Sequence, residues 1–335
     1  MKAAVVNAPH ELVITDIEEP RPGMGEILVE VRACGVCGTD LHIYDGQFPA
    51  KYPIVMGHEF CGVVVAVGDN VSQISVGDKV AIQPNVSCGS CELCRRGRPN
   101  LCQGLLAYGV HMHGGFAQMC IVRHENAFHI GGLSFEAGAL VEPLACCLHG
   151  INLVGVNAGE RVIVFGAGPI GLLLAQLCRL RGASEVVVVD VLEERIHASS
   201  SLGFVALSSY ELNSKEAEHT HSYELAIDAS GATAVIERMT RFVRDGGRLL
   251  IFGVAPLDAD VPIRPFEIYR RELTLIGAFS LGYEFDSAIR LLSSGQIHYK
   301  PLITHRMPLD GIHEALEYKR RGVGLKAIVF PSDEV

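Results

Sequence analysis

The spacing of apolar residues predicts a β-rich structure for roughly the first 145 residues of this 335-residue chain. Short alternating or apolar runs are separated there by turns that contain Gly, Pro and Asp, a pattern typical of strands joined by tight connections. Strands are expected at residues 1–6, 27–31, 61–67 and 79–82.

The hydrophobic pattern changes near residue 160. Residues 161–165 form a continuous run of the kind that is buried on both faces of a parallel sheet. Helices and strands are then expected in alternation, at 169–181, 185–190, 195–202, 224–228 and 248–254. Such alternation predicts a doubly wound parallel sheet, and therefore an α/β fold class.

The pattern becomes mixed again after about residue 279. A helix is expected at 286–293, a strand at 302–305, a helix at 311–320 and a last strand at 326–330. A chain of this length is long for one core and suits two domains.

Composition narrows the classes of partner. Apolar residues make up 49% and charged residues 20%, as expected for a well-packed globular enzyme. The net charge of -10 argues against nucleic acid or an anionic membrane as a partner. No signal peptide is expected, and the richest apolar stretch is interrupted by Glu142, Pro143 and His149, so no membrane span is expected.

Four of the eleven cysteines form a compact motif, C-x2-C-x2-C-x7-C, in a loop rich in glycine. Four thiolates so close in sequence predict a tetrahedral zinc site, and its closed coordination predicts a structural role. Two disulfides and an iron–sulfur cluster are the alternatives. The motif comprises Cys88, Cys91, Cys94 and Cys102.

The other cysteines fit a reducing cytoplasm, in which thiols serve metal binding or packing. They lie in apolar runs, and we expect them to be small core side chains. They are Cys34, Cys61, Cys120, Cys146, Cys147 and Cys178.

A G-x-G-x-x-G motif follows the expected strand at 161–165 and opens the expected helix, which is the context of a dinucleotide site. Asp190 closes the next strand and is expected to bind the adenosine ribose, which favours NAD over NADP. Arg195 is either a contact to the adenine or a solvated helix cation. The loop residues expected to bind the cofactor are Gly166, Gly168, Pro169, Ile170 and Gly171.

A second metal site is expected nearer the N-terminus. A catalytic zinc needs about three protein ligands and one open position, and Cys37 and His58 offer a thiolate and an imidazole. Glu142 is a candidate third ligand, because a carboxylate in an apolar segment is costly to bury without a positive partner. An isolated Cys or His on an apolar strand is more often a core residue, but the other motifs reverse that expectation.

These motifs together resemble the zinc-dependent medium-chain dehydrogenase/reductase superfamily, within its polyol (sorbitol-like) and threonine dehydrogenase branches. The resemblance covers nearly the whole chain, to Gly322–Lys326. The motifs that carry it are Cys37-Gly38-Thr39-Asp40, Gly57-His58-Glu59, the cysteine quartet, Glu142-Pro143 and the glycine loop with Asp190 and Arg195.

The resemblance implies a discontinuous GroES-like catalytic domain, residues 1–145 and 279–335, around a Rossmann domain at 146–278 that binds NAD. It implies two zinc ions, the catalytic one held by Cys37, His58 and Glu142 or Glu59. Thr39 and His42 match proton-relay positions. Further cofactor contacts are expected at Gly253, Val254 and Phe279.

The implied reaction interconverts a secondary alcohol of a polyol, or of a similar polar small molecule, and its ketone. The implied assembly is a homo-oligomer, a dimer or a tetramer, in the cytoplasm. A threonine or 2,3-butanediol dehydrogenase, a non-catalytic relative and a zinc-free enone reductase are the alternatives. The residues of the catalytic site, Cys37, Thr39, His58 and Glu142, speak against a non-catalytic relative, and the cysteine quartet with Gly57-His58-Glu59 speaks against an enone reductase.

Substrate identity is less constrained by the sequence. Ile43, Ser280 and Leu281 stand where sorbitol dehydrogenases carry Tyr and an Arg-Tyr pair that contact the polyol. Tyr44 and Tyr283 are the candidates to replace those contacts. Phe48, Phe116 and Phe279 are candidates to wall a substrate pocket.

Overall fold

The computed structural model describes residues 1–332 and divides the chain into two compact units. The first unit is discontinuous and combines Met1–Ala145 with the chain from Leu281 onward. The second unit is Cys146–Ser280. The sequence boundary expected after residue 278 falls two residues earlier than the one in the structure.

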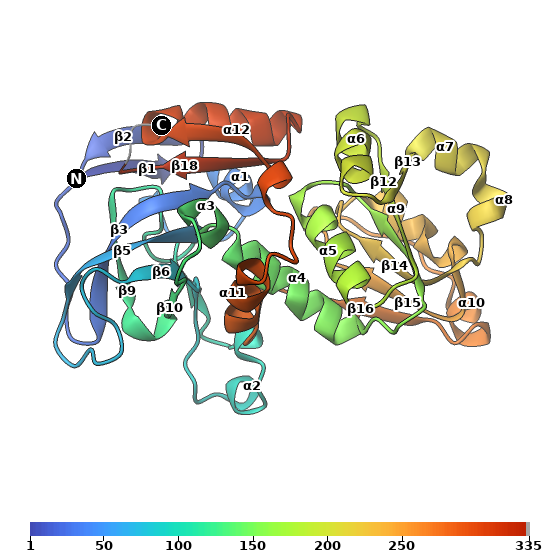
Figure 1. Cartoon of the computed structure of the whole chain (residues 1–335), viewed down its shortest axis with the longest axis horizontal. Coiled ribbons are helices and arrows are strands. Elements are labelled where there is room, and N and C mark those ends of the chain that lie inside the picture. The colour runs from blue at the N-terminus through green and yellow to red at the C-terminus, as the bar shows by residue number, and fades with distance from the viewer. Residues whose placement is uncertain (333–335) are drawn as a thin grey trace. The chain divides into compact units, whose positions relative to one another are not determined.

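The first unit is built on a seven-stranded sheet, ordered β10-β6-β5-β3-β18-β17 with β9 also paired to β3 (Figure 1). A three-stranded sheet, β2-β1-β4, and a β7-β8 pair complete it. The strands are β1 (Lys2–Ala8), β2 (Glu11–Asp16), β3 (Glu26–Gly35), β4 (Ile54–Val55), β5 (Glu59–Val67), β6 (Lys79–Ile82), β7 (Asn85–Val86), β8 (Leu106–Ala107), β9 (Met119–Arg123), β10 (Ala127–His129), β17 (Ile303–Pro308) and β18 (Lys326–Phe330).

Helices of the first unit are short, apart from those near its C-terminal end. They are α1 (Gly38–Tyr44), α2 (Glu92–Arg95), η1 (Pro99–Leu101), η2 (His124–Asn126), α3 (Phe135–Gly138), α11 (Phe285–Ser293), η4 (Lys300–Leu302), η5 (Leu309–Gly311) and α12 (Ile312–Arg321). Helix α4 (Val141–Val154) begins in this unit and ends in the second.

Two central strands of the first unit come from its early and its late segment. Strand β3 alternates inward Ile27, Val29 and Val31, all fully buried, as expected for a strand with one face on the core. Strand β18, from the far end of the chain, pairs antiparallel with β3 so that Ile328 lies opposite Gly35. Strands from the two ends of the chain therefore belong to one sheet.

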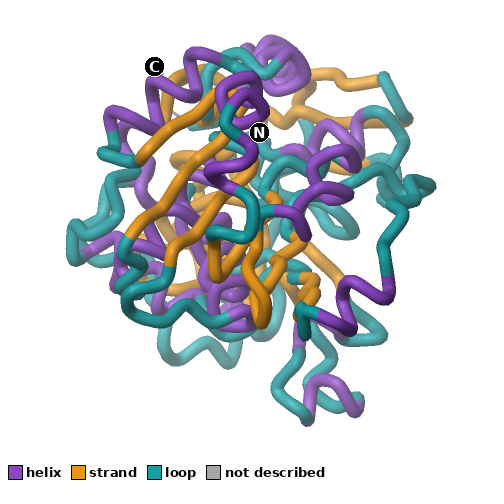
Figure 2. Tube along the Cα trace, turned by 90° about the vertical axis from the view of Figure 1, so that its right-hand side faces the viewer, coloured by secondary structure: helices purple, strands orange, loops and turns teal. Residues whose placement is uncertain are grey.

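The second unit is a parallel sheet of six strands, ordered β13-β12-β11-β14-β15-β16, with helices beside it (Figure 2). The strand order reverses at β11, where ligands bind beyond the carboxyl ends in such sheets. The strands are β11 (Arg161–Phe165), β12 (Glu185–Asp190), β13 (Val205–Ser208), β14 (Tyr223–Asp228), β15 (Val243–Ile251) and β16 (Thr274–Gly277). The helices are α5 (Pro169–Leu180), α6 (Glu193–Ser201), α7 (Ser209–Ser214), α8 (Glu216–His219), α9 (Thr233–Arg238), η3 (Met239–Arg241) and α10 (Pro265–Arg270).

The predicted α/β class with a doubly wound parallel sheet is confirmed, and β11, β12 and β18 have the predicted bounds. Strand β15 differs. It begins at Val243 rather than at residue 248 and ends at Ile251, three residues early. Its start includes a polar Gly246-Gly247 turn beside a register shift against β14, which conceals the strand in the hydrophobic pattern.

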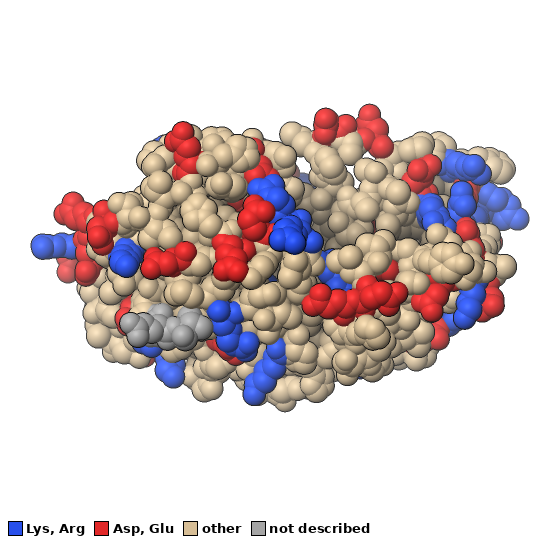
Figure 3. All heavy atoms as spheres, turned by 90° about the horizontal axis from the view of Figure 1, so that it is seen from above, with Lys and Arg blue, Asp and Glu red and all other residues tan. Residues whose placement is uncertain are grey.

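One helical stretch, Phe135–Val154, is long and apolar enough to cross a membrane by length and composition. However, 78% of its most apolar window is buried inside the protein, so the stretch serves the core of the fold. On the face shown in Figure 3, acidic and basic side chains are interspersed, in line with the modest net negative charge.

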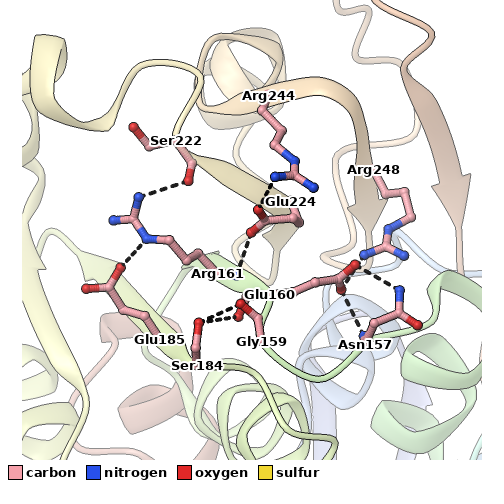
Figure 4. A network of polar contacts seen from close by, with 10 residues as sticks. All are labelled: Asn157, Gly159, Glu160, Arg161, Ser184, Glu185, Ser222, Glu224, Arg244 and Arg248. Atoms are coloured by element: carbon pink, nitrogen blue, oxygen red, sulfur yellow. Dashed lines mark hydrogen bonds and ion pairs between the residues drawn. The ribbon is translucent and has the colours of Figure 1, made fainter.

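A network of charged side chains joins the amino ends of the parallel strands (Figure 4). Arg161 Nε donates to Glu185 at 2.7 Å, and its guanidinium also donates to the carbonyl of Ser222 at 3.0 Å. Beside it, Glu160 accepts from the backbone and side chain of Asn157 and from Arg248. The network ties strands β11, β12, β14 and β15 at the edge opposite the glycine loop.

The Glu160 carboxylate provides a pH test of this network. Burial raises the pKa of Glu160, but the hydrogen bonds from Asn157 and Arg248 outweigh it and lower the pKa. A depressed folded-state pKa stabilises the protein above the unfolded-state value, and the contribution is lost as the pH falls through the folded value. We expect Glu160→Gln to lower the free energy of unfolding by about 1–3 kcal/mol at neutral pH.

The difference between Glu160→Gln and the parent should shrink as the pH falls below the ordinary glutamate pKa of about 4.3 and toward the lowered pKa of Glu160 in the folded state. Urea unfolding of both proteins at several pH values measures this. Exposed Glu237 is the matched control, and Glu237→Gln should change stability by less than ~0.5 kcal/mol. A difference that stays constant down to pH 3 would contradict the assignment.

Candidate active site and metal centres

Helix α1 starts at the first of the expected catalytic ligands. Cys37 is its N-cap residue, in extended backbone geometry, and its N–H donates to Asp40 Oδ2 at 2.8 Å. An acceptor at the third helical position satisfies a backbone donor that the helix itself leaves unpaired. Asp40 is fully buried, so this contact fixes the start of the helix and the thiol at its end.

The second carboxylate oxygen of Asp40 reaches the loop before β5. Asp40 Oδ1 accepts from Gly57 N at 3.1 Å and lies 3.6 Å from His58 Nδ1. Gly57 has φ +90, and a Cβ there would lie 2.7 Å from Cys34 Sγ, so both backbone and space demand glycine. Asp40 thereby places the imidazole of His58 beside the thiol of Cys37.

The structure brings Cys37, His58 and Glu59 together, with one ligand atom of each within 4.8 Å of the others. His58 Nδ1 is buried and has no hydrogen-bond partner among the described residues. A sulfur, an imidazole nitrogen and a carboxylate oxygen are the donors zinc prefers, and three of them leave a position open. The residues present therefore fit a catalytic zinc.

Electrostatics at His58 favour a cation at this place. Burial lowers the pKa of His58, but the negative charges of Asp40 and Cys37 outweigh it and hold the pKa well above its usual value. The same charges that would retain a proton on the ring would attract a metal ion to it.

A buried lysine neutralises the third candidate ligand. Lys326 Nζ of β18 forms an ion pair with Glu59 Oε2 of β5, and both side chains are almost fully buried. Burial lowers the pKa of Lys326, but Glu59, Cys37 and Glu142 outweigh it and raise the pKa above its usual value. The ammonium is therefore surrounded by the negative groups of the site.

Glu142, the other expected ligand, is not in the three-residue group formed by the described residues. It is buried in the first turn of α4, and its charge acts on Lys326. Of the two candidate carboxylates, Glu59 is grouped with Cys37 and His58. Glu142 instead acts on Lys326, the lysine that pairs with Glu59.

Both expected relay residues lie on α1. Thr39 Oγ1 is 3.9 Å from Cys37 Sγ, so its hydroxyl lies beside the candidate metal site. His42 is three residues further on, and side chains at i and i+3 share one face of a helix. His42 Nδ1 lies 3.1 Å from Gln47 Oε1.

The cysteine quartet also converges, with its four sulfur atoms within 4.8 Å of one another. All eleven cysteines are free thiols, so the disulfide alternative is wrong. Hydrogen bonds from Ser90 N and its hydroxyl, then from Cys91 N, lower the pKa of Cys88 to about 6, whereas burial raises that of Cys94 to about 11. Four sulfur donors fit a closed zinc site.

Glycine is favoured at each of the three positions of the nucleotide loop for a different structural reason. Gly166 has φ +101, which makes the tight turn after β11. A Cβ on Gly171 would lie 1.7 Å from Gly166 O, so helix α5 packs directly on the turn. At Gly168 a Cβ would approach nothing closer than Arg195 Nη1 at 4.0 Å, which leaves the open space that a pyrophosphate requires. Pro169 and Ile170 form the first turn of α5.

Asp190 ends β12 and faces this loop. Its Oδ2 accepts from Ala167 N at 2.7 Å, and its Oδ1 accepts from Val191 N at 2.8 Å. The Arg195 guanidinium lies 3.7 Å from Asp190 Oδ2, so Arg195 is drawn to the site rather than only to solvent. The loop, the carboxylate and the helix N-terminus together fit a dinucleotide.

Three further expected cofactor residues lie at the carboxyl ends of β15 and β16. A Cβ on Gly253 would lie 2.1 Å from Gly231 N, so the loops after β14 and β15 touch there. Val254 and Phe279 are exposed, at 69% and 54%. Exposed apolar side chains beyond the ends of parallel strands are available to a ligand.

Two of the three residues at the sorbitol-contact positions are apolar and buried. Ile43 and Leu281 are fully buried, and Ser280 has a left-handed backbone with φ +55. Tyr44 lies edge-on to His10 and donates weakly to its carbonyl at 3.4 Å. Tyr283 remains exposed.

Leu281 and Tyr283 line a small polar cavity in the first unit. Its volume is about 160 Å³. Amide side chains of Gln83, Asn85 and Asn126 also face it. Of the expected pocket-wall aromatics, Phe116 is fully buried and Phe48 is partly buried against the same core.

Sequence reasoning gave no role to Asp40 or to Lys326, and it missed Asp228. The Asp228 carboxylate, fully buried at the end of β14, accepts from Ser230 N at 2.9 Å and Gly231 N at 3.1 Å, and so shapes the loop beside Gly253. A charged residue at the edge of an apolar segment was the available signal in each case, because such a residue is buried only with partners.

Comparisons with known proteins agree with this architecture. Residues 23–132 match the alcohol dehydrogenase GroES-like domain, and residues 169–294 match the zinc-binding dehydrogenase family. The chain is 39% identical over 292 residues to D-altritol 5-dehydrogenase of Agrobacterium fabrum, covering 85% of this chain and 86% of that protein. It is 33% identical to D-arabinitol dehydrogenase 1 of Uromyces fabae, covering 99% and 97%.

A solved structure is similar throughout. It is a Sinorhizobium meliloti protein named as a zinc-binding dehydrogenase and bound to NADP, with 35% identity, a TM-score of 0.94 and coverage of 98% of this chain and 99% of that one. The chain belongs to the zinc-dependent medium-chain dehydrogenases, in their polyol dehydrogenase branch. It is an oxidoreductase that uses zinc and a nicotinamide cofactor.

The two sulfur-containing sites should respond differently to substitution. Freshly purified protein should hold two zinc ions per chain. Cys91→Ser should remove one of them and lower the free energy of unfolding by roughly 2–4 kcal/mol, because a structural zinc contributes folding free energy. His58→Ala should remove the other, lower turnover by at least ~10³-fold and leave stability nearly unchanged.

Atomic emission and thermal unfolding measure both effects. Cys146→Ser is the control, since Cys146 is a half-buried thiol outside both ligand groups. Full zinc content in either Cys91→Ser or His58→Ala would contradict the corresponding assignment.

Proposed function

We propose that this protein is an NAD-dependent zinc dehydrogenase that interconverts a secondary alcohol of a polyol, or of a similar polar small molecule, and the corresponding ketone. The observation that carries this proposal is the grouping of Cys37, His58 and Glu59, with the hydroxyl of Thr39 beside the thiol. A packing or binding protein has no use for an open set of metal ligands next to a hydroxyl that can transfer a proton.

The metal ligands are assigned from this geometry. Cys37, His58 and Glu59 hold the catalytic zinc, with Glu142 close enough to influence the same lysine. The quartet Cys88, Cys91, Cys94 and Cys102 holds a structural zinc. Zinc at this site would supply Lewis acidity toward the alcohol oxygen, and the nicotinamide would accept the hydride.

Proton removal is assigned to side chains of α1. Thr39 Oγ1, beside the thiol, accepts the proton of the substrate hydroxyl, and His42, one turn along the same face, is the base that takes it toward solvent. Both side chains are only partly buried, as a path for protons to water requires.

Polyols are proposed as substrates because the curated relatives named above are named for altritol and arabinitol. The sorbitol-type contacts are absent, since Ile43 and Leu281 are apolar and buried. A site that binds hydroxyl groups by hydrogen bonds discriminates strongly against substrates that lack them. We therefore expect a narrow set of substrates.

A panel of pentitols, hexitols, 2,3-butanediol, threonine and simple primary alcohols, assayed by NADH absorbance, tests this proposal. Oxidation of one or a few polyols at a secondary carbon is expected, with kcat/KM for ethanol at least ~100-fold lower. Ethanol as the best substrate would overturn the proposal, and threonine as the best would replace the substrate class.

NAD is proposed as the cofactor because Asp190 lies where the ribose is expected. A buried carboxylate at the end of β12 repels a 2′-phosphate and accepts hydrogen bonds from ribose hydroxyls. The NADP found in the Sinorhizobium meliloti structure belongs to that protein and makes the choice of cofactor a direct test here.

We expect kcat/KM for NAD to exceed that for NADP by on the order of 100-fold, since the buried Asp190 carboxylate repels a 2′-phosphate. Asp190→Ser should narrow this ratio at least ~10-fold, whereas the exposed control Asp286→Ser should leave it unchanged. Steady-state kinetics with both cofactors measures the ratio. Equal use of NAD and NADP by the parent would refute the assignment.

A cytoplasmic homo-oligomer, a dimer or a tetramer, is the proposed assembly. Strand β16 is the last in its sheet, and an unpaired edge can extend to another chain. Apolar side chains on β16 and the neighbouring α10 are exposed, among them Phe266, Tyr269 and Leu275. Light scattering in solution determines the mass, and a monomer would contradict this assembly.

A further inference from the structure

The C-terminal end of α1 is closed by a motif centred on the proposed base. Gly46 N donates to Ile43 O at 3.0 Å, and Gln47 N donates to His42 O at 2.8 Å. Together with the left-handed Gly46, at φ +73, these are the paired bonds of a Schellman motif. The backbone of Gln47 is therefore bound to the backbone of His42.

The side chain of Gln47 returns to the same histidine. Gln47 Oε1 lies 3.1 Å from His42 Nδ1. An amide oxygen only accepts, so in this pair Nδ1 carries the proton of the neutral ring and Nε2 keeps its lone pair. Two contacts from one residue, through the backbone and through the side chain, restrict both the position and the tautomer of the imidazole.

The turn that presents Gln47 requires glycine at position 46 and packs against a neighbouring segment. A Cβ on Gly46 would lie 2.9 Å from the ring of Pro9, in addition to the strain of its positive φ. The segment of Pro9 is itself held to α1, because His10 N donates to Tyr44 O at 2.8 Å. The position of Gln47 is thus set by the fold, although its side chain is exposed.

The carboxylate on the same turn is committed to other groups. Asp45 accepts two hydrogen bonds from Arg320 of α12, at 2.9 and 2.7 Å, and lies 3.6 Å from His10. A carboxylate oxygen could accept from Nδ1 as an amide oxygen does. Because Arg320 engages Asp45, the neutral amide of Gln47 is the partner that the His42 ring meets.

We infer that Gln47 is a positioning residue for the reaction: it holds His42 as the Nδ1–H tautomer, with Nε2 free to accept the proton. This inference rests on the proposed function, because the role of His42 as the base is itself proposed. Gln47 touches neither the metal ligands nor Thr39 among its contacts described above, and it acts through His42 alone.

The direct test is the tautomer of His42 in the full protein without substrate. Nitrogen-15 NMR of histidine-labelled protein near pH 8.5, with the His42 signals assigned by their loss in His42→Gln, distinguishes protonated from unprotonated ring nitrogens. The parent should show a protonated Nδ1 and an unprotonated Nε2. Gln47→Met should move the ring toward the Nε2–H form, and Gln47→Glu, which keeps an acceptor, should preserve the parent tautomer.

Kinetics supply a second readout. Gln47→Met should lower kcat about 10–100-fold with little change in KM, a loss within the range of general base catalysis, and Gln47→Glu should recover most of it. Gln73→Met, at an exposed position of the same unit, is the control and should leave kcat and the His42 signals unchanged.

An unprotonated Nδ1 in the parent, or an unchanged tautomer in Gln47→Met, would overturn the inference. Equal losses in Gln47→Met and Gln47→Glu would overturn it as well, because they would indicate a structural role. The NMR result does not depend on the substrate, so a failed polyol assay together with the expected tautomer would refute the proposed function and leave the positioning of His42 intact.

Discussion

A buried ion pair between the two ends of the discontinuous unit is the constraint on which the candidate catalytic site depends. Lys326 begins the last strand, and Glu59 begins strand β5. A Cβ on Gly35, which lies between them on β3, would be 2.2 Å from Glu59 Oε2 and 2.8 Å from Lys326 Cε. Glycine at that position is therefore a requirement of the pair. Removing one partner of such a pair typically costs about 3–5 kcal/mol, because the other charge stays buried.

The charges around this pair explain why a metal belongs here. Asp40, Glu59 and Glu142 are buried carboxylates, and the thiol of Cys37 becomes negative when it binds a metal. Lys326 is the cation that the structure places among them, and it balances only part of this charge. Uncompensated buried negative charge is costly, and a divalent ion at the proposed site of Cys37, His58 and Glu59 would offset it. Lys326 and the metal would therefore together compensate the buried negative charge of the site.

The sequence predicts those features whose parts lie close together in the chain. The cysteine quartet and the glycine loop are local, so their spacing indicates their geometry, and the structure brings each together. Cys37 and His58 were predicted as ligands from residue type and from the surrounding motifs. The choice between Glu59 and Glu142 was not predictable, because it depends on how β5 and α4 are placed by the fold.

Other features depend on contacts between segments far apart in sequence. Lys326 acquires its partner only when β18 pairs with β3, and Gln47 faces His42 only because a left-handed Gly46 turns the chain back. The hydrophobic pattern of the sequence predicts neither the pairing of Lys326 nor the contact of Gln47 with His42. Strand β15 was misplaced for a related reason. Its first residue, Val243, pairs with Tyr223 of β14, but the register then shifts to Arg248, and the polar residues between them carry no apolar pattern.

Zinc K-edge X-ray absorption on the Cys91→Ser variant tests the central claim, that Cys37, His58 and Glu59 form the catalytic metal site, most directly. With the structural site removed, the spectrum reports the remaining zinc alone. One sulfur at about 2.3 Å and nitrogen or oxygen ligands at about 2.0–2.2 Å are predicted, with the sulfur lost on further substitution of Cys37. A zinc with only sulfur ligands, or a spectrum that does not respond to Cys37→Ser, would contradict the account.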